Sequence, residues 1–287
     1  MSGFSTLSPL ENIGVLVRLA LAEDVGPGDW STDWTVNSGR SGRATVVAKA
    51  DVVIAGVEAA MAVFEVVDSA LTVDTVLGDG SRAGSGDVVL EVTGPVAGIL
   101  SGERVALNFL GHLSGIATLT RAYVDAVVGT GARVTDTRKT TPGWRQLEKA
   151  AVRAGGGLNH RMGLYDMVMV KDNHIAVAGG ITAAVTRVRA RNEQRLPVVV
   201  EVRTLKELEE ALGLGVERIL LDNMDLRALR SAVEQTHRLG SGRPELEVSG
   251  NVAMDTIREI AETGVDLVSV GAITHSAPVA DLSLQMV

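Results

Sequence analysis

Three features that the sequence lacks argue against whole classes of protein before any motif is considered. The 287 residues contain no cysteine, which excludes disulfide bonds, thiolate catalysis and cysteine-ligated metal sites. No apolar run approaches the ~18 residues of a membrane helix, and residues 1–15 show no basic-then-apolar leader. Net positive charge is lacking too, with 27 Lys and Arg against 35 Asp and Glu, which argues against a general nucleic-acid binder. We therefore expect a cytoplasmic protein without membrane or nucleic-acid partners.

What is present is the composition of a well-filled globule, with 46% hydrophobic and 22% charged residues. The charge, however, is segregated along the chain. Residues 133–171 hold eight Lys and Arg against three Asp and Glu, whereas the remainder holds 19 against 32. Folding does not require this segregation. A cavity that collects small, highly charged anions does, and the basic segment predicts such a cavity.

The N-terminal part of the chain predicts an α+β layer structure. A helix is predicted over residues 8–24, because a capping box precedes its apolar stripe. The other early elements are strands at 44–50, 71–76 and 88–92 and a helix at 58–67. A long helix capped by Ser101 is then predicted, with interruptions at Gly111 and Gly115.

The C-terminal part has a different rhythm, in which short β-branched runs alternate with helical segments. The runs lie at residues 133–137, 167–170, 198–202, 218–221, 246–248 and 267–270. Repeated strand–helix units imply a parallel sheet, and a domain of this length closes most economically into a barrel. Six strands do not by themselves establish a full eightfold barrel.

Polar groups or glycine turns follow each of these strands. They form the segments 138–139, 171–174, 201, 222–223, 249–251 and 271–275. In an α/β barrel the carboxyl ends of the strands meet on one face, where active sites lie. The agreement among six strands therefore predicts one polar rim.

The residue types at this rim suit one kind of chemistry. Carboxylate and phosphate groups would be bound by the cations Arg138, Lys139, His160, Arg161 and Lys171. Glu201 and Asp222 are hard oxygen ligands, suited to Mg²⁺ held jointly with substrate phosphates. The turns at 249–250 and 271–272 offer backbone N–H groups that can cradle a phosphate. The set indicates transfer involving a phosphorylated sugar.

Each feature also has an ordinary structural interpretation. A single Lys or Arg is usually a solvated surface charge, and Asp222 with Asn223 after a strand is often a helix cap. The glycine run 155–157 lacks the Lys-Ser/Thr of a P-loop, which favours a flexible connection.

Several longer motifs resemble the quinolinate phosphoribosyltransferase family, the decarboxylating nicotinate-nucleotide pyrophosphorylases of NAD biosynthesis. The motifs are TDTRKTTPG at 135–143, GGGLNHR at 155–161, KDNH at 171–174, SGER at 101–104, LSGIAT at 113–118, LLDN at 220–223 and VGA at 270–272. They follow the family's order from about residue 20 to residue 276. Motifs this long and this many are specific, whereas a lone RKT would not be.

The resemblance implies a two-domain type II phosphoribosyltransferase. Its incomplete, about seven-stranded α/β barrel would span residues 113–275. An N-terminal α/β open-sandwich domain would span residues 1–112 and receive the tail at 276–287. The resemblance further implies a homodimer, or a multiple of dimers, in which Arg104 of one subunit binds quinolinate in the site of its neighbour.

The family's site residues carry over motif by motif. In the subunit that houses the site, quinolinate would be bound by Arg138, His160, Arg161 and Lys171. Phosphoribosyl pyrophosphate would be bound by Lys139, Ser249, Gly250, Asn251, Gly271, Ala272 and His275. Glu201 and Asp222 would hold Mg²⁺. The catalytic set would be Lys139, Lys171, Glu201 and Asp222.

The implied reaction joins quinolinate to phosphoribose with loss of CO2, giving nicotinate mononucleotide and pyrophosphate without an organic cofactor. Three positions depart from the family pattern, namely Val199, Arg203 and Asn251. Two alternatives stay open: a type II phosphoribosyltransferase for nicotinate or a related heterocycle, and a non-catalytic anion-binding relative. Release of CO2 would distinguish the first, and binding without pyrophosphate formation would favour the second.

Overall fold

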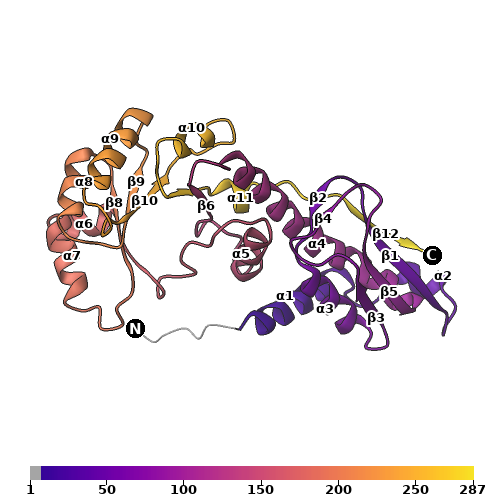
Figure 1. Cartoon of the computed structure of the whole chain (residues 1–287). Coiled ribbons are helices and arrows are strands. Elements are labelled where there is room, and N and C mark those ends of the chain that lie inside the picture. Colours follow the sequence, from indigo (N-terminus) through magenta and orange to yellow (C-terminus); the bar gives the residue numbers. More distant parts are fainter. Residues whose placement is uncertain (1–7) are drawn as a thin grey trace. The chain divides into compact units, whose positions relative to one another are not determined.

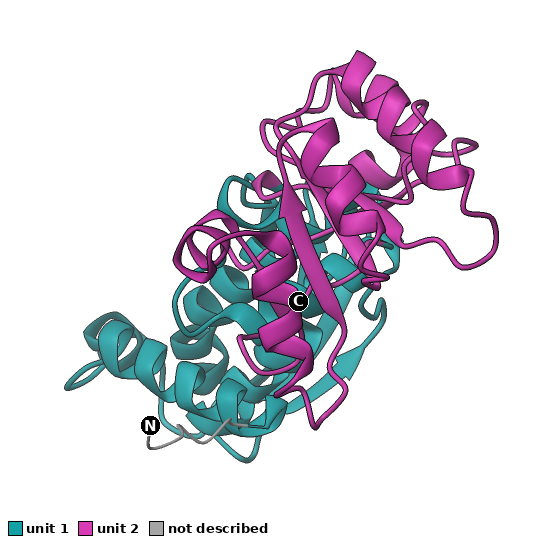
Figure 2. Cartoon of the chain, turned by 90° about the vertical axis from the view of Figure 1, so that its left-hand side faces the viewer, with its two compact units in different colours: residues 1–121, 140–156, 273–287 teal, residues 122–139, 157–272 magenta. Residues whose placement is uncertain are grey.

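The computed structural model describes residues 8–287, which divide into two compact units (Figure 2). The first unit takes in residues up to 121, then 140–156 and 273–287. The second takes in residues 122–139 and 157–272. The division predicted between residues 112 and 113 falls inside helix α4 (Val96–Ala126), and that domain boundary stays a prediction.

The sheet of the first unit is antiparallel and includes the C-terminal end of the chain. Its strand order is β12 (Leu282–Met286), β1 (Ser41–Ala48), β5 (Val88–Pro95) and β3 (Thr72–Thr75). A separate two-stranded ladder joins β2 (Val52–Val53) and β4 (Arg82–Ala83). Strand β12 lies at the edge, where Leu284 is paired with Val46 of β1. The alternation along β1 buries Ala44 and Val46, whose side chains point to the core face.

The helices of the first unit are α1 (Pro9–Asp24), α2 (Trp30–Thr35), α3 (Val57–Val67), most of α4, α5 (Arg145–Ala154) and most of α11 (Ala272–His275). Side-chain caps begin two of them, α1 at Ser8 and α2 at Asp29. The predicted capping box of α1 is confirmed, since Glu11 N–H donates to Ser8 Oγ at 3.3 Å and the Glu11 carboxylate accepts from Ser8 N–H. Ser101 is not a cap, because α4 already begins at Val96 and the Ser101 hydroxyl donates to Asp29 at 2.9 Å.

Helix α4 runs without the interruptions predicted at Gly111 and Gly115. These glycines instead make room for the C-terminal tail. A Cβ atom at Gly115 would lie 2.0 Å from the Pro278 carbonyl oxygen, and Ala280 N–H donates to the Gly111 carbonyl at 2.9 Å. None of the helices in residues 8–287, α4 included, is long and apolar enough to cross a bilayer.

The second unit holds a six-stranded parallel sheet. Its order is β6 (Arg133–Thr135), β11 (Leu267–Ser269), β10 (Glu245–Ser249), β9 (Arg218–Asp222), β8 (Val198–Val202) and β7 (Val168–Val170). Beyond β6, a single parallel bridge links Thr135 to Leu158. Six strands and one bridge thus stand where about seven strands were predicted. Within residues 8–287 no strand pairing joins Leu158 to β7, so the barrel is open there.

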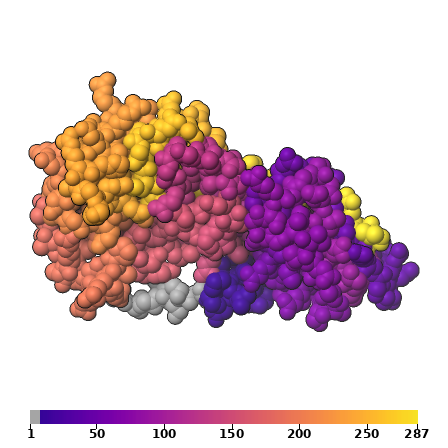
Figure 3. Space-filling view, viewed as in Figure 1, coloured from indigo at the N-terminus to yellow at the C-terminus, as the bar shows by residue number. Residues whose placement is uncertain are grey.

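Helices cover one face of this sheet. They are α6 (Asp172–Ala178), α7 (Ile181–Arg189), α8 (Leu205–Leu212), α9 (Leu226–His237) and α10 (Ile257–Ala261). Figure 1 shows α7, α8 and α9 side by side along the strands. In the space-filling view their side chains close the gaps between the ribbons (Figure 3). The opposite face of the strands is left to form the interior of the open barrel.

Candidate active site

Charged side chains lie at the carboxyl ends of neighbouring strands, above an apolar layer. Met169, Val199 and Leu220 form one buried cluster and occupy adjacent strands. Because side chains two residues apart along a strand share a face, Lys171, Glu201 and Asp222 follow them on the same side of the sheet. Val199, one of the departures from the family pattern, therefore belongs to the floor of the site and not to its charged rim.

The first contact in the charged layer joins the predicted catalytic residues Lys171 and Glu201. Lys171 Nζ lies 2.8 Å from Glu201 Oε2, and the Glu201 side chain is only 8% exposed. Lys171 also donates its backbone N–H to His174 Nδ1 at 3.0 Å, where α6 begins. The KDNH motif therefore fixes the backbone of Lys171 while leaving its ammonium group against a nearly buried carboxylate.

Arg203, which sequence reasoning treated only as a departure, lies in this layer too. Its guanidinium contacts Asp172 at 2.9 Å and Asp222 at 3.2 Å, and it approaches Glu201 to 3.9 Å. Its hydrogen bond to Asp222 and then the charge of Asp172 raise the pKa of Arg203. The signal available from sequence was its position two residues beyond Glu201, on the same face of the chain.

The carboxylates of this layer suit a divalent cation bound together with a phosphorylated ligand. Glu201 and Asp222 end adjacent strands and are both within reach of one guanidinium, so a single cation can span them. Within residues 8–287 no group of three or more acidic or histidine side chains could hold a metal unaided. Mg²⁺ commonly binds through one or two carboxylates and substrate phosphates, so this donor set fits Mg²⁺.

Arg138 and Arg161 bring like charges together near the same strands. Burial lowers the pKa of Arg161, and the charge of Arg138 lowers it further, against an opposing effect of Asp166. The Arg161 side chain is nearly buried, and its Nη1 donates to the Met167 carbonyl at 3.1 Å. Arg138, by contrast, is exposed, and two positive charges this near one another favour the binding of a dianion.

His160 is held from both sides of its ring. Its Nδ1 accepts the backbone N–H of Arg161 at 2.7 Å, and its Nε2 lies 3.3 Å from Glu247 Oε1. Its own N–H donates to Asp136 at 2.8 Å. Because Nδ1 accepts a hydrogen bond, the ring proton lies on Nε2 and faces Glu247. The His160 ring is thus fixed between the Arg161 backbone and Glu247. Its predicted contact with quinolinate stays a prediction.

Glu247, which sequence reasoning missed, is the centre of this buried network. Besides His160, its carboxylate accepts hydrogen bonds from the Ser269 hydroxyl and from Arg218 Nη1, the latter at 3.0 Å. Burial alone would raise the pKa of Glu247. The contact with His160, the hydrogen bond from Ser269 and the charge of Arg218 outweigh that effect and lower it. The signal available from sequence was a charged residue between the apolar residues Leu246 and Val248, whose side chains lie on the other face of the strand.

Acid is expected to remove the stability that Glu247 contributes. Its folded-state pKa lies below the ordinary value of 4.5, so this contribution is present above about pH 4.5 and is lost as the pH falls through the folded pKa. We expect Glu247→Gln to lower the Tm at pH 7 and the difference from the wild type to shrink between pH 4.5 and pH 3. Parallel Tm curves for the two proteins would contradict this.

The turn after β10 is built around a required glycine. Gly250 has φ +98°, and a Cβ atom there would lie 2.2 Å from Asn223 Oδ1. Asn223 donates its N–H to the Ser249 carbonyl at 3.0 Å and its side-chain amide to Asp222 at 3.0 Å. Asn223 and Asn251 themselves have φ of 53° and 48°. The conformation of Asn251 explains why glycine suits this place, since Asn is among the few other residues that tolerate it.

Substitution at Asn251 should separate backbone conformation from side-chain chemistry. Asn251→Gly keeps the left-handed conformation accessible, so we expect the free energy of unfolding to change by less than about 1 kcal/mol. Asn251→Val forces a β-branched residue into it and should cost about 1–3 kcal/mol. Urea unfolding of the two variants measures the difference. Equal stability of the two would show that the turn relaxes without cost.

The remaining predicted residues divide between the units. In the second unit, Lys139 donates its N–H to Thr137 Oγ1 at 3.0 Å, while Gly271 and Ala272 lie where β11 leads into α11. The first unit contains Arg104, exposed on α4, and His275, whose Nδ1 lies 2.6 Å from Ser276 Oγ. One connected group of charged side chains is formed by Lys171, Glu201, Asp172, Arg203 and Asp222.

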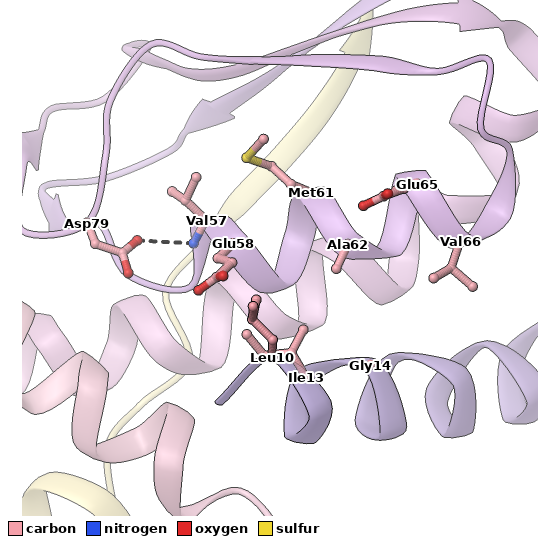
Figure 4. A pocket seen from close by; sticks show the side chains of 10 residues that line it. All are labelled: Leu10, Ile13, Gly14, Val57, Glu58, Met61, Ala62, Glu65, Val66 and Asp79. Carbon is pink, nitrogen blue, oxygen red and sulfur yellow. Dashed lines mark hydrogen bonds between the residues drawn. The ribbon is translucent and has the colours of Figure 1, made fainter. Parts of the chain in front are cut away.

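A groove lies between α1 and α3 in the first unit (Figure 4). Its lining combines apolar side chains such as Ile13 and Met61 with the carboxylates of Glu58, Glu65 and Asp79. The Asp79 carboxylate accepts the N–H of Val57 at the start of α3, at 3.0 Å. The charged side chains of this lining are all negative and repel carboxylates and phosphates. The groove is therefore unsuited to the anionic substrates expected at the basic residues of the second unit.

The comparisons with known proteins cover both units. The model of the quinolinate phosphoribosyl transferase C-terminal domain matches residues 116–285, and that of the N-terminal domain matches residues 29–114. A probable carboxylating nicotinate-nucleotide pyrophosphorylase from Synechocystis is 45% identical, over 93% of this chain and 90% of that protein. The chloroplastic enzyme of rice is 44% identical, over 97% of this chain and 78% of that protein.

Solved structures agree with these matches. NadC from Streptococcus pyogenes has a TM-score of 0.90 at 42% identity, over 99% of this chain and 100% of that one. The nicotinate-nucleotide pyrophosphorylase of Francisella tularensis also has a TM-score of 0.90, at 36% identity and 98% coverage of both chains. The fold and the matches define an enzyme of the phosphoribosyltransferase class. The chain belongs to the quinolinate phosphoribosyl transferase family.

Proposed function

We propose that the protein transfers the phosphoribosyl group of phosphoribosyl pyrophosphate to quinolinate, with decarboxylation to nicotinate mononucleotide. The observation that carries this proposal is the pair of guanidinium groups at Arg138 and Arg161, where burial first, and then the charge of Arg138, lower the pKa of the nearly buried Arg161. Quinolinate bears two carboxylates and can bring one to each guanidinium, whereas a monocarboxylate brings only one. The names of the curated relatives agree with this substrate.

The proposal assigns each residue of the site a role. Arg138, Arg161 and Lys171, with His160 beneath them, would hold the carboxylates of quinolinate. Lys139 and the turns at Ser249, Gly250 and Asn251, and at Gly271, Ala272 and His275, would hold the phosphates of the second substrate. Glu201 and Asp222 would hold Mg²⁺, which when bound neutralises charge on the departing diphosphate.

The chemistry balances without an organic cofactor. The pyridine nitrogen forms a bond to the anomeric carbon of the sugar as the bond to pyrophosphate breaks. The ring nitrogen is then cationic and stabilises the electron pair left when the neighbouring carboxylate departs as CO2. A proton from solvent completes nicotinate mononucleotide. The protein's contribution is to hold the nucleophile and the sugar in line and to surround the separating charges with fixed cations.

The test is the release of pyrophosphate and CO2 by purified protein given quinolinate, phosphoribosyl pyrophosphate and Mg²⁺. We expect equimolar release of the two products from quinolinate. Nicotinate as a parallel substrate should be used at least roughly 10- to 100-fold less efficiently in kcat/KM, because it lacks the second carboxylate that the paired guanidinium groups can bind. Pyrophosphate without CO2 would favour the alternative of a type II enzyme for another heterocycle. Binding of both ligands with no release would favour a non-catalytic relative.

The assembly and the location are part of the same proposal. We propose a homodimer, or a multiple of dimers, in which Arg104 of one subunit contributes to the active site of the neighbouring subunit. The exposure of Arg104 on α4 is compatible with this role. We also propose a cytoplasmic location, although relatives from plants are named chloroplastic or mitochondrial. Sedimentation of the purified protein tests the first, and cell fractionation tests the second.

A further inference from the structure

Arg203 is the cation that draws together the carboxylates at the ends of three strands. Asp172 follows β7, Asp222 ends β9, and Glu201 lies between them on β8. The guanidinium reaches the first two at 2.9 and 3.2 Å and the third at 3.9 Å. Lys171 supplies a second positive charge through its contact with Glu201. Without Arg203, three negative charges would face one positive charge.

The guanidinium of Arg203 lies where a divalent cation held by the proposed metal ligands would need to bind. Arg203 touches both Glu201 and Asp222, the two carboxylates proposed to hold Mg²⁺. A guanidinium and a metal ion cannot occupy the same place, and their like charges repel at short distance. The Arg203 side chain is 54% exposed, and its backbone is held independently of the guanidinium, because the Arg203 N–H donates to Glu207 at 2.6 Å. It can therefore leave the carboxylates without disturbing the strand.

We infer that Arg203 is an internal competitor of the divalent cation, closing the carboxylate site in the free protein and leaving it when the metal enters. The inference rests on the proposed function for the location of the metal at Glu201 and Asp222. Its consequence is that the free protein binds the metal weakly. When a diphosphate binds, its negative charge attracts the guanidinium away from the carboxylates. The same charge favours entry of the metal ion between the diphosphate and the carboxylates.

The test is direct binding of Mn²⁺ to the free protein at low ionic strength, followed by electron paramagnetic resonance. Arg203→Ser should bind Mn²⁺ about tenfold more tightly than the wild type, because a unit positive charge a few ångströms from the metal is removed. Arg203→Lys keeps the charge on a group that cannot span two carboxylates, and should lie between them. Arg227→Ser, at an exposed position on α9, removes the same charge elsewhere and should leave the affinity unchanged.

A second measurement guards against loss of folding. The Tm of Arg203→Ser should fall in the absence of metal, because three carboxylates then repel, and should rise with added Mg²⁺ more than the wild-type Tm does. Unchanged or weaker Mn²⁺ binding by the serine variant would overturn the inference, as would an equal gain in Arg227→Ser. Pyrophosphate release measured on the same samples keeps the two proposals apart. Tighter metal binding in a protein that releases none would support this inference and defeat the proposed function.

Discussion

Replacing Arg161 by alanine is expected to lower kcat/KM for quinolinate by about a thousandfold. Its guanidinium is nearly buried, and its pKa is lowered by burial and by the charge of Arg138. Because little water reaches this place, solvent cannot substitute for the positive charge when the side chain is removed. Truncating one partner of a buried charge pair costs about 2–5 kcal/mol, which corresponds to roughly 30- to 5,000-fold in rate. Steady-state release of pyrophosphate over a range of quinolinate concentrations measures the loss.

Two further variants separate an effect on quinolinate binding from an effect on folding. Arg161→Lys keeps a charge but not the planar fork, so it should recover only part of the loss. Arg187→Ala, at an exposed position on α7, should keep wild-type kcat/KM. Circular dichroism must show folded protein in every case. A folded Arg161→Ala enzyme within tenfold of the wild type would remove Arg161 from the quinolinate site.

Mixing two inactive variants is expected to restore activity if the neighbouring subunit completes each site. Arg104 lies in the first unit, and Lys139 in the second, so Arg104→Ala and Lys139→Ala would damage different contributions to one shared site. In a mixed dimer one of the two sites then receives both intact residues. With random exchange half of the dimers are mixed, and about a quarter of wild-type activity should return. Pyrophosphate release after co-refolding of the two variants measures it.

The control for this experiment is a pair of variants that damage the same contribution. Lys139→Ala mixed with Lys171→Ala changes two residues of the second unit, so a mixed dimer has no intact site and should stay inactive. Subunit exchange is checked with a tag on one variant. Proven exchange without recovery by the Arg104 and Lys139 pair would show that each subunit builds its site alone.

The sequence predicts the repeated elements of this fold better than its closure. The strand at residues 198–202 coincides with β8, and the α1 capping box is present, because local side-chain patterns decide both. The short β12 and the lone bridge at Leu158 were missed, since each depends on a partner far away in the chain. For the same reason a glycine pair in α4 was taken for helix interruptions.

The site shows the same division between local and distant information. Lys171, Glu201 and Asp222 were predicted to lie at one rim, and the structure places them on one side of adjacent strands. Arg203 and Glu247 were missed in their roles. Arg203 is defined by three carboxylates from three strands, and Glu247 by a histidine 87 positions earlier in the chain, so neither forms a local motif. A pattern can supply the residues of a rim, but only packing shows which of them neutralise one another.

The C-terminal tail constrains the order in which the chain can fold during its synthesis. Strand β12 pairs with β1, and the segment before it passes over the glycines of α4, so the first unit needs residues that are made after the whole of the second unit. All of the second unit, by contrast, has been made once residue 272 is in place. The first unit therefore cannot be completed before the second. Until β12 has been made, β1 presents an open edge, which is where a nascent chain of this enzyme is most exposed to wrong pairing.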